Sequence, residues 1–197
     1  MKIRYFTYII ITIAIVISIG ILVFRKFNLN NNFYIGQPID SLNGVIVYYN
    51  GGVDNVSGRN ITTDNYNIGL QYQCVEFVKR YYYEYLNHKM PDSYGHAKDF
   101  FDHTVKDGQI NSRRNLIQYT NPSATKPQID DLLIFGAILS NRYGHVAIIS
   151  NVTDNEIEII QQNPGAFGKS RVKFDMKING GQYYIDNKRI LGWLRKE

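Results

Sequence analysis

Hydrophobic and polar positions divide the chain into an N-terminal apolar run, an amphipathic helix and a series of strands. The run from Tyr5 to Phe24 contains no charged side chain. At about 1.5 Å rise per residue it is long enough for the roughly 30 Å hydrocarbon core of a bilayer. Farther along, Val75, Val78 and Tyr82 recur at helical spacing. We therefore expect a membrane-spanning helix, and a second helix that packs on a core and continues to about Leu86.

Apolar, β-branched and aromatic runs in the rest of the chain predict strands. These strands cover residues 44–49, 116–119, 131–135, 145–149, 156–162, 183–185 and 190–194. A further helix is expected over His96–Val105, and a long surface loop extends up to Asn67. Because tight turns join successive strands in antiparallel fashion, the predicted fold class is α+β, with an antiparallel sheet against which the helix at Cys74 packs.

The same pattern predicts three parts: a transmembrane anchor (1–27), an Asn-rich tether (28–38) and one folded domain (39–197). A cleaved signal peptide is the alternative for the first part, but it needs a shorter apolar core and a small-residue cleavage site. The apolar run has two basic residues on each side, so the positive-inside count is nearly balanced. The α-amino group adds to the N-terminal side, which favours a single-pass protein with its domain outside the cytoplasm.

Charge and cysteine content narrow the function classes. Four of the 22 Lys and Arg residues flank the apolar run, and all 17 acidic residues lie at or beyond Asp40. The domain is therefore nearly neutral, which argues against a nucleic-acid partner. A single cysteine excludes an internal disulfide. The sequence has no His/Cys cluster and no glycine-rich phosphate loop, so we expect neither a metal nor another cofactor.

The lone cysteine, Cys74, is a candidate nucleophile because it falls in the first turn of the predicted helix. Unpaired N–H groups and the helix dipole at that position favour the thiolate, so we expect a lowered thiol pKa. The alternative is a small buried hydrophobic residue. A cysteine nucleophile needs a base, and His145 is the candidate because it follows Gly144 at the start of a strand, on the same face as Ala147 and Ile149. The other three histidines are predicted to be solvated: His88, His96 and His103.

Gln161 is the candidate for orienting that base. It shares the core-facing side of the predicted return strand with Ile157 and Ile159, whereas Glu158 points the other way, into water. A buried amide is costly unless it is hydrogen-bonded, and an imidazole N–H is a natural partner. The alternative is that Gln161 caps a loop or bonds to the backbone.

Four segments in this order resemble the cysteine, histidine-dependent amidohydrolase/peptidase (CHAP) family. They are Gln73-Cys74-Val75-Glu76-Phe77-Val78-Lys79-Arg80, Asp131-Leu132-Leu133-Ile134-Phe135, Gly144-His145-Val146-Ala147-Ile148-Ile149 and Gln161-Gln162-Asn163. The likeness covers about residues 44–195, and within the family it is similar to the amidase domain of glutathionylspermidine synthetase. The resemblance implies a papain-like CHAP fold that needs no metal or other cofactor.

The resemblance also implies amide hydrolysis through a thioester. Cys74 would attack the carbonyl, and His145 would protonate the leaving amine. The Cys74 backbone N–H would stabilise the oxyanion, with the Gln73 side chain as a further candidate donor. Two positions depart from the family, which commonly has Glu where this chain has Gln161 and Gly where it has Asp130. The change at Asp130 is expected to alter only a turn. A neutral orienter cannot stabilise an imidazolium by charge, so lower activity is expected.

Three functions follow as hypotheses. The first is a membrane-anchored CHAP amidase or endopeptidase, held by residues 5–24, that hydrolyses peptidoglycan peptides. The second is a hydrolase of a small γ-glutamyl or polyamine amide such as glutathionylspermidine. The third is an inactive CHAP-fold binding module, which Gln161 alone supports. The expected partner of the two enzyme hypotheses is a peptide or small amide substrate.

Overall fold

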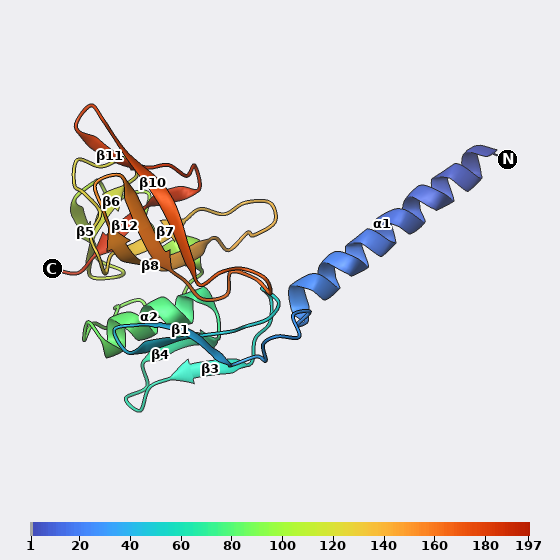
Figure 1. Ribbon diagram of the computed structural model, residues 1–197, viewed down its shortest axis with the longest axis horizontal. Coiled ribbons are helices and arrows are strands. Elements are labelled where there is room, and N and C mark those ends of the chain that lie inside the picture. Colours follow the sequence, from blue (N-terminus) through green and yellow to red (C-terminus); the bar gives the residue numbers. More distant parts are fainter. Residues whose placement is uncertain (1) are drawn as a thin grey trace.

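The computed structural model describes residues 2–197, with side chains from Tyr5 onward, and its fold is α+β as predicted (Figure 1). Its helices are α1 (Lys2–Lys26), α2 (Cys74–Glu84) and the short 3₁₀ helix η1 (Ala97–Phe100). Its strands are β1 (Pro38–Leu42), β2 (Val45–Tyr48), β3 (Gly58–Ile61), β4 (Asn67–Gln71), β5 (Gln109–Asn111), β6 (Leu116–Thr120), β7 (Leu132–Phe135), β8 (His145–Val152), β9 (Glu156–Ile160), β10 (Arg171–Asn179), β11 (Gln182–Ile185) and β12 (Ile190–Arg195).

Eight strands form one antiparallel sheet in the order β11-β10-β9-β8-β7-β12-β6-β5. Side-chain alternation gives this sheet two apolar faces. On one face Val146, Ile148 and Ile160 pack against Phe77 and the rest of the buried side of α2. The opposite face carries a second buried cluster, which includes Leu133, Phe135, Ala147, Ile149, Ile157, Ile159 and Trp193. Adjacent residues of one strand therefore face different clusters, so Val146 faces α2 whereas His145 lies on the side of the second cluster.

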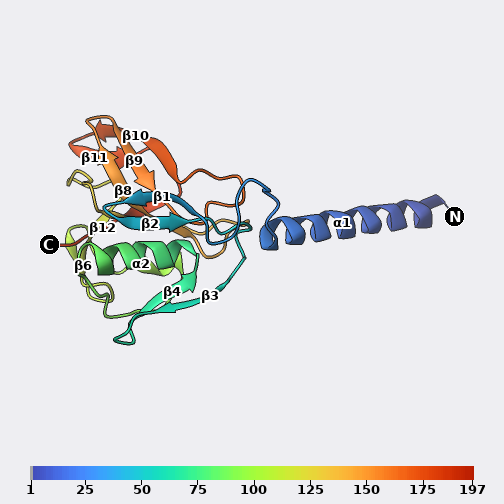
Figure 2. The ribbon, with the colours of Figure 1, turned by 60° about the horizontal axis from the view of Figure 1, so that its bottom comes forward.

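Two hairpins flank α2, which lies between β1–β2 and β3–β4 (Figure 2). The β3–β4 hairpin corrects the prediction of a loop up to Asn67. Its polar sequence hides a strand pair, because Ile68 is buried against α2 and Gly69 lies so close that a Cβ would be 3.1 Å from the Cα of Glu76.

The helix predicted over His96–Val105 is also wrong, since only the single turn of η1 forms there. The chain turns away after it because Asp102 accepts the Thr104 N–H at 2.9 Å and donates its own N–H to Gln118 at 2.9 Å. His96 and His103 are exposed as expected, but His88 is buried, with its Nε2 at 2.9 Å from the Arg114 carbonyl oxygen.

Helix α1 projects away from the rest of the molecule, and its side chains from Tyr5 to Phe24 are exposed (Figures 1 and 2). Residues Tyr5–Lys26 are long and apolar enough to cross a membrane, a property shared by anchors and signal peptides. The end of α1 and the segment that follows it are held to the domain. Arg25 pairs with Asp54 at 2.7 Å, and the Asn30 side chain donates to the Ala166 carbonyl at 2.9 Å.

Candidate active site

Cys74 is the first residue of α2, as the apolar pattern predicted, and extended Gln73 precedes it at the N-cap. Backbone N–H groups of Val146, Val75 and Cys74 itself act on the thiol and lower its pKa. Burial outweighs them and raises the thiol pKa to about 11, because protein surrounds the sulfur although the residue as a whole is only half-buried. The predicted lowering of the thiol pKa is therefore wrong.

His145 begins β8, where Gly144 lets the preceding loop approach closely. Gly144 has φ +74°, and a Cβ there would lie 2.5 Å from the Phe135 carbonyl oxygen. The imidazole contacts the Phe135 ring, with centroids 5.8 Å apart, on the face that also carries Ala147 and Ile149. Burial lowers the pKa of His145 to about 4. The neighbouring charge of Arg189 acts in the same direction, and a hydrogen bond to Gln161 opposes both.

Gln161 lies just beyond β9, is only 8% exposed, and contacts His145 directly. Its Nε2 donates to the Lys169 carbonyl at 2.9 Å, so its Oε1 is turned toward the imidazole, 2.8 Å from His145 Nε2. Because an amide oxygen only accepts, His145 Nε2 must carry the proton. In the neutral ring Nδ1 is then the basic nitrogen, and no residue that the structure describes bonds to it.

Cys74 and His145 come together from different elements. The thiol lies at the N–H of Val146, the residue next to His145 on β8, so α2 brings the sulfur to the strand that carries the imidazole. Within residues 2–197 no hydrogen bond joins the thiol to the ring. The structure thus brings His145 and Gln161 into contact and places the Cys74 thiol at Val146, the next residue along β8.

Gln73 has a different position from the one an oxyanion donor requires. Its Nε2 donates to the Val53 carbonyl at 3.2 Å and to the Asn55 carbonyl at 2.7 Å, and its Oε1 accepts from Asn163 at 2.7 Å. Both amide hydrogens are therefore used within the protein. In this conformation the side chain holds the loop at Val53 in place, so of the two oxyanion donors expected from the sequence only the backbone N–H at Cys74 is left as a candidate.

A buried polar network that the sequence interpretation missed ties the base to the nucleophile. Gln162 donates to Glu76 at 2.7 Å and to the Gln73 carbonyl at 3.1 Å. Glu76 in turn pairs with Arg80 at 2.7 Å inside α2, and both side chains are buried. The segment just beyond β9, which holds Gln161 and Gln162, is thereby fixed to the first turn of α2. The four-residue spacing of Glu76 and Arg80 was the signal available in the sequence.

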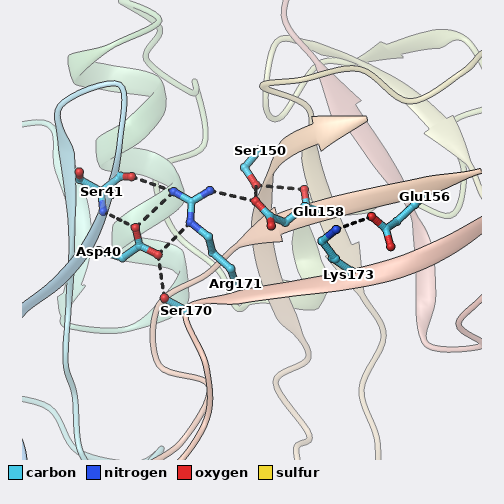
Figure 3. A network of polar contacts seen from close by, with 8 residues as sticks. All are labelled: Asp40, Ser41, Ser150, Glu156, Glu158, Ser170, Arg171 and Lys173. Atoms are coloured by element: carbon cyan, nitrogen blue, oxygen red, sulfur yellow. Dashed lines mark hydrogen bonds and ion pairs between the residues drawn. The ribbon is translucent and has the colours of Figure 1, made fainter. Parts of the chain in front are cut away.

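Glu158 has other partners and is unavailable as a carboxylate partner for His145. Figure 3 shows it beside Ser150 and Arg171. It accepts from Ser150 at 2.9 Å and from Arg171 at 3.0 Å. Arg171 also binds Asp40 of β1 at 3.0 Å, so the network fastens the β1–β2 hairpin to the sheet. The prediction that Glu158 points away from the core-facing side of β9 is confirmed, although an ion pair and not water surrounds it.

A cleft of about 250 Å³ opens beside the imidazole. Its lining residues are Val53, Phe135, Asn141, His145, Gln161, Asn163, Pro164, Phe174, Asn187 and Arg189. Among the described residues, no group of three or more His, Cys, Asp or Glu is arranged to hold a metal ion. The cleft is therefore a space next to the candidate base in which a substrate can lie.

Comparison with known proteins assigns the family. A family model described as CHAP domain matches residues 63–163, just over half of the chain, and this range contains Cys74, His145 and Gln161. The chain belongs to the CHAP domain family. CHAP membership places it among the amidases and peptidases that use a cysteine, and it confirms the resemblance found in the sequence.

Two curated relatives carry a similar CHAP region. Trypanothione synthetase of Crithidia fasciculata is 34% identical over 107 residues, which are 54% of this chain and 16% of that protein. Glutathionylspermidine synthase of the same organism is 28% identical in an alignment 142 residues long that covers 64% of this chain and 19% of that protein. The similarity thus covers less than a fifth of each relative.

Proposed function

We propose that this CHAP domain hydrolyses an amide bond through a thioester on Cys74, with His145 as the general acid and base and Gln161 as its orienter. The observation that carries the proposal is the hydrogen bond between His145 Nε2 and Gln161 Oε1, because it leaves Nδ1 as the nitrogen that can accept a proton. The position of Cys74 at the N-terminus of α2, next to β8, supports its role as nucleophile.

The thiol and imidazole start as a neutral pair, because the thiol pKa is raised to about 11 and that of His145 is lowered to about 4. Nδ1 therefore takes the thiol proton as the sulfur attacks the carbonyl carbon and the C–S bond forms. The imidazolium gives this proton to the leaving nitrogen, and the C–N bond breaks to leave the thioester. Water then attacks, His145 accepts its proton, and release of the carboxylic acid restores the thiol.

For the substrate, we propose peptidoglycan peptides at the outer surface of the cytoplasmic membrane. The support is the apolar helix α1 and the way it joins the domain. Arg25, at the end of α1, binds Asp54 and the carbonyl of Ser140, next to Val53 and Asn141 of the cleft. An α1 that remained in the bilayer would hold the cleft close to the membrane surface.

The second candidate substrate is a small γ-glutamyl or polyamine amide. It is favoured by the similarity to trypanothione synthetase and glutathionylspermidine synthase. An inactive binding module is the third candidate, and the neutral Gln161 is its support.

One experiment separates these candidates. The full chain in detergent is incubated with peptidoglycan fragments and with glutathionylspermidine, and products are followed by mass spectrometry. We expect cleavage of the stem peptides by the wild type and none by Cys74→Ala. Cleavage of glutathionylspermidine alone would favour the second candidate, and no cleavage of either would favour the binding module. A reporter fused after residue 40 that is found in the cytosol would contradict the peptidoglycan proposal.

A further inference from the structure

Arg189, in the turn before β12, lines the cleft beside His145 and has no partner of its own. Its side chain makes no hydrogen bond and no ion pair with any residue that the structure describes, and its Nε–H is enclosed without an acceptor. A buried donor left unpaired destabilises the folded state. An unpaired guanidinium in a cleft is therefore a feature that needs a reason.

The other arginines show how unusual this is. From Arg25 onward, every other arginine donates at least one hydrogen bond, including Arg80 and Arg195, which bind buried carboxylates. The same holds for Arg25, Arg59, Arg113, Arg114, Arg142 and Arg171. Arg189 alone among these keeps all its donors unused.

The surroundings hold the guanidinium toward the cleft. It lies over the Phe135 ring, 5.8 Å from the ring centroid, and the same ring contacts His145. The Arg189 carbonyl accepts the Gly136 N–H at 2.7 Å, which fixes the backbone beneath the side chain. The positive charge also lowers the pKa of His145, so the cation acts directly on the candidate base.

Asn163 adds a second unpaired group to the same cleft. Its Nδ2 donates hydrogen bonds to the Val53 carbonyl and to Gln73 Oε1, but its Oδ1 is buried and no described residue donates to it. This oxygen is closed off from the cleft in the present conformation, so the accessible unpaired group is the Arg189 cation. A carboxylate would satisfy its free terminal donors.

We propose that Arg189 binds a free carboxylate of the substrate, and that the cleft selects amides of compounds that carry such a carboxylate. This inference rests on the proposed amide hydrolysis and adds the substrate class. Bidentate binding through the two terminal nitrogens is a favoured geometry for arginine and carboxylate. Unlike the buried Nε, these nitrogens are not enclosed, and no described residue accepts a hydrogen bond from them.

Alkylation of the single cysteine tests the inference without knowledge of the substrate. The full chain in detergent is treated with iodoacetate, which carries a carboxylate, and with neutral iodoacetamide, and Cys74 labelling is followed by intact mass. The rate constant for iodoacetate is divided by that for iodoacetamide, and this ratio is normalised to the same ratio measured with N-acetylcysteine. We expect this ratio to exceed one and to fall about tenfold in Arg189→Gln, as loss of a charge-assisted hydrogen bond predicts. Lys188→Gln removes a charge one residue away, outside the cleft, and should leave the ratio unchanged.

The outcomes separate this inference from the proposed function. Fast labelling with a ratio that Arg189→Gln does not change would overturn the carboxylate site and leave the hydrolase intact. Slow labelling with a ratio that depends on Arg189 would support the site and count against an activated Cys74. Failure of both reagents to label Cys74 would overturn both.

A competition experiment identifies the ligand chemistry. N-acetylglycine should protect Cys74 from iodoacetate in the wild type but not in Arg189→Gln, whereas N-acetylglycinamide should protect neither. Equal protection by inorganic phosphate would overturn the assignment to carboxylates.

Discussion

Gln161→Glu tests the most unusual feature of the site, its neutral orienter. In the wild type, Gln161 presents an oxygen to His145 at 2.8 Å and an amide N–H to the Lys169 carbonyl at 2.9 Å. Glutamate in the same rotamer would keep the first contact as a charged one. Its second oxygen would face the Lys169 carbonyl, where a donor had been.

The two consequences have opposite signs. A carboxylate in contact with a titrating group shifts its pKa by about 1–3 units, so the pKa of His145 should rise from about 4 toward its ordinary value. Each unit is worth about 1.4 kcal/mol of imidazolium stabilisation. The imidazolium holds the proton between its removal from the thiol and its delivery to the leaving nitrogen. Stabilising the imidazolium should therefore increase turnover. The unmatched oxygen at Lys169 should lower the free energy of unfolding by about 1–3 kcal/mol.

The assay is the pH profile of kcat/KM, combined with urea denaturation. His145 acts as a base only when it is deprotonated, so a raised pKa moves the acid limb of the profile to higher pH in Gln161→Glu. Gln161→Met is the matched control, since it removes both hydrogen bonds and adds no charge, and it should reduce activity. An acid limb that stays in place in the Glu variant would refute the orienting role of Gln161.

Three further predictions follow from single contacts. Gly144→Ala should lose about 1–3 kcal/mol of stability and most activity, because the added Cβ would lie 2.5 Å from the Phe135 carbonyl oxygen. Gly108 has nearly the same positive φ but its Cβ would meet nothing within 4 Å, so equal losses in Gly108→Ala would contradict the steric explanation. Burial lowers the pKa of Lys79 to about 7, so between pH 7 and 9 the folded state binds fewer protons than the unfolded chain, and urea titrations of the wild type should show stability rising by about 2 kcal/mol. Lys79→Met should lack this rise, and the same dependence of stability on pH in the variant would contradict the prediction. The lowered pKa of His145 predicts that about 3 kcal/mol of stability is lost as the pH falls from 6.5 to 4. This loss should be smaller in His145→Gln, and an equal loss in the wild type and the variant would show that His145 is not its cause.

Local patterns in the sequence predicted most of the elements that position the site. The helix starting at Cys74 and the strands of residues 145–149 and 156–162 were confirmed, because their apolar spacing is strong and their turns are short. Strand β10 was not predicted. Its charged residues Lys173, Asp175 and Lys177 face solvent, and its strand character comes from pairing with β9 and β11.

The candidate site could be predicted only as far as it is local. Alternation along the return strand identified Gln161 as a partner for His145, and the hydrogen bond between them follows from it. The thiol pKa could not be read from the helix start, because it depends on how closely the sheet covers the sulfur. The hydrogen bonds that occupy the Gln73 side chain, and the lack of any for the Arg189 side chain, likewise depend on loops distant in sequence.

The central claim is that Cys74 becomes acylated during amide hydrolysis. The most direct measurement is mass spectrometry of the full chain quenched during turnover of stem peptides or glutathionylspermidine, followed by mapping of the modified peptide. The account predicts an adduct on Cys74 with the mass of the acyl part of the substrate, removable by hydroxylamine and absent in Cys74→Ala, which forms no product. Continued product formation by Cys74→Ala, without any adduct in the wild type, would contradict it.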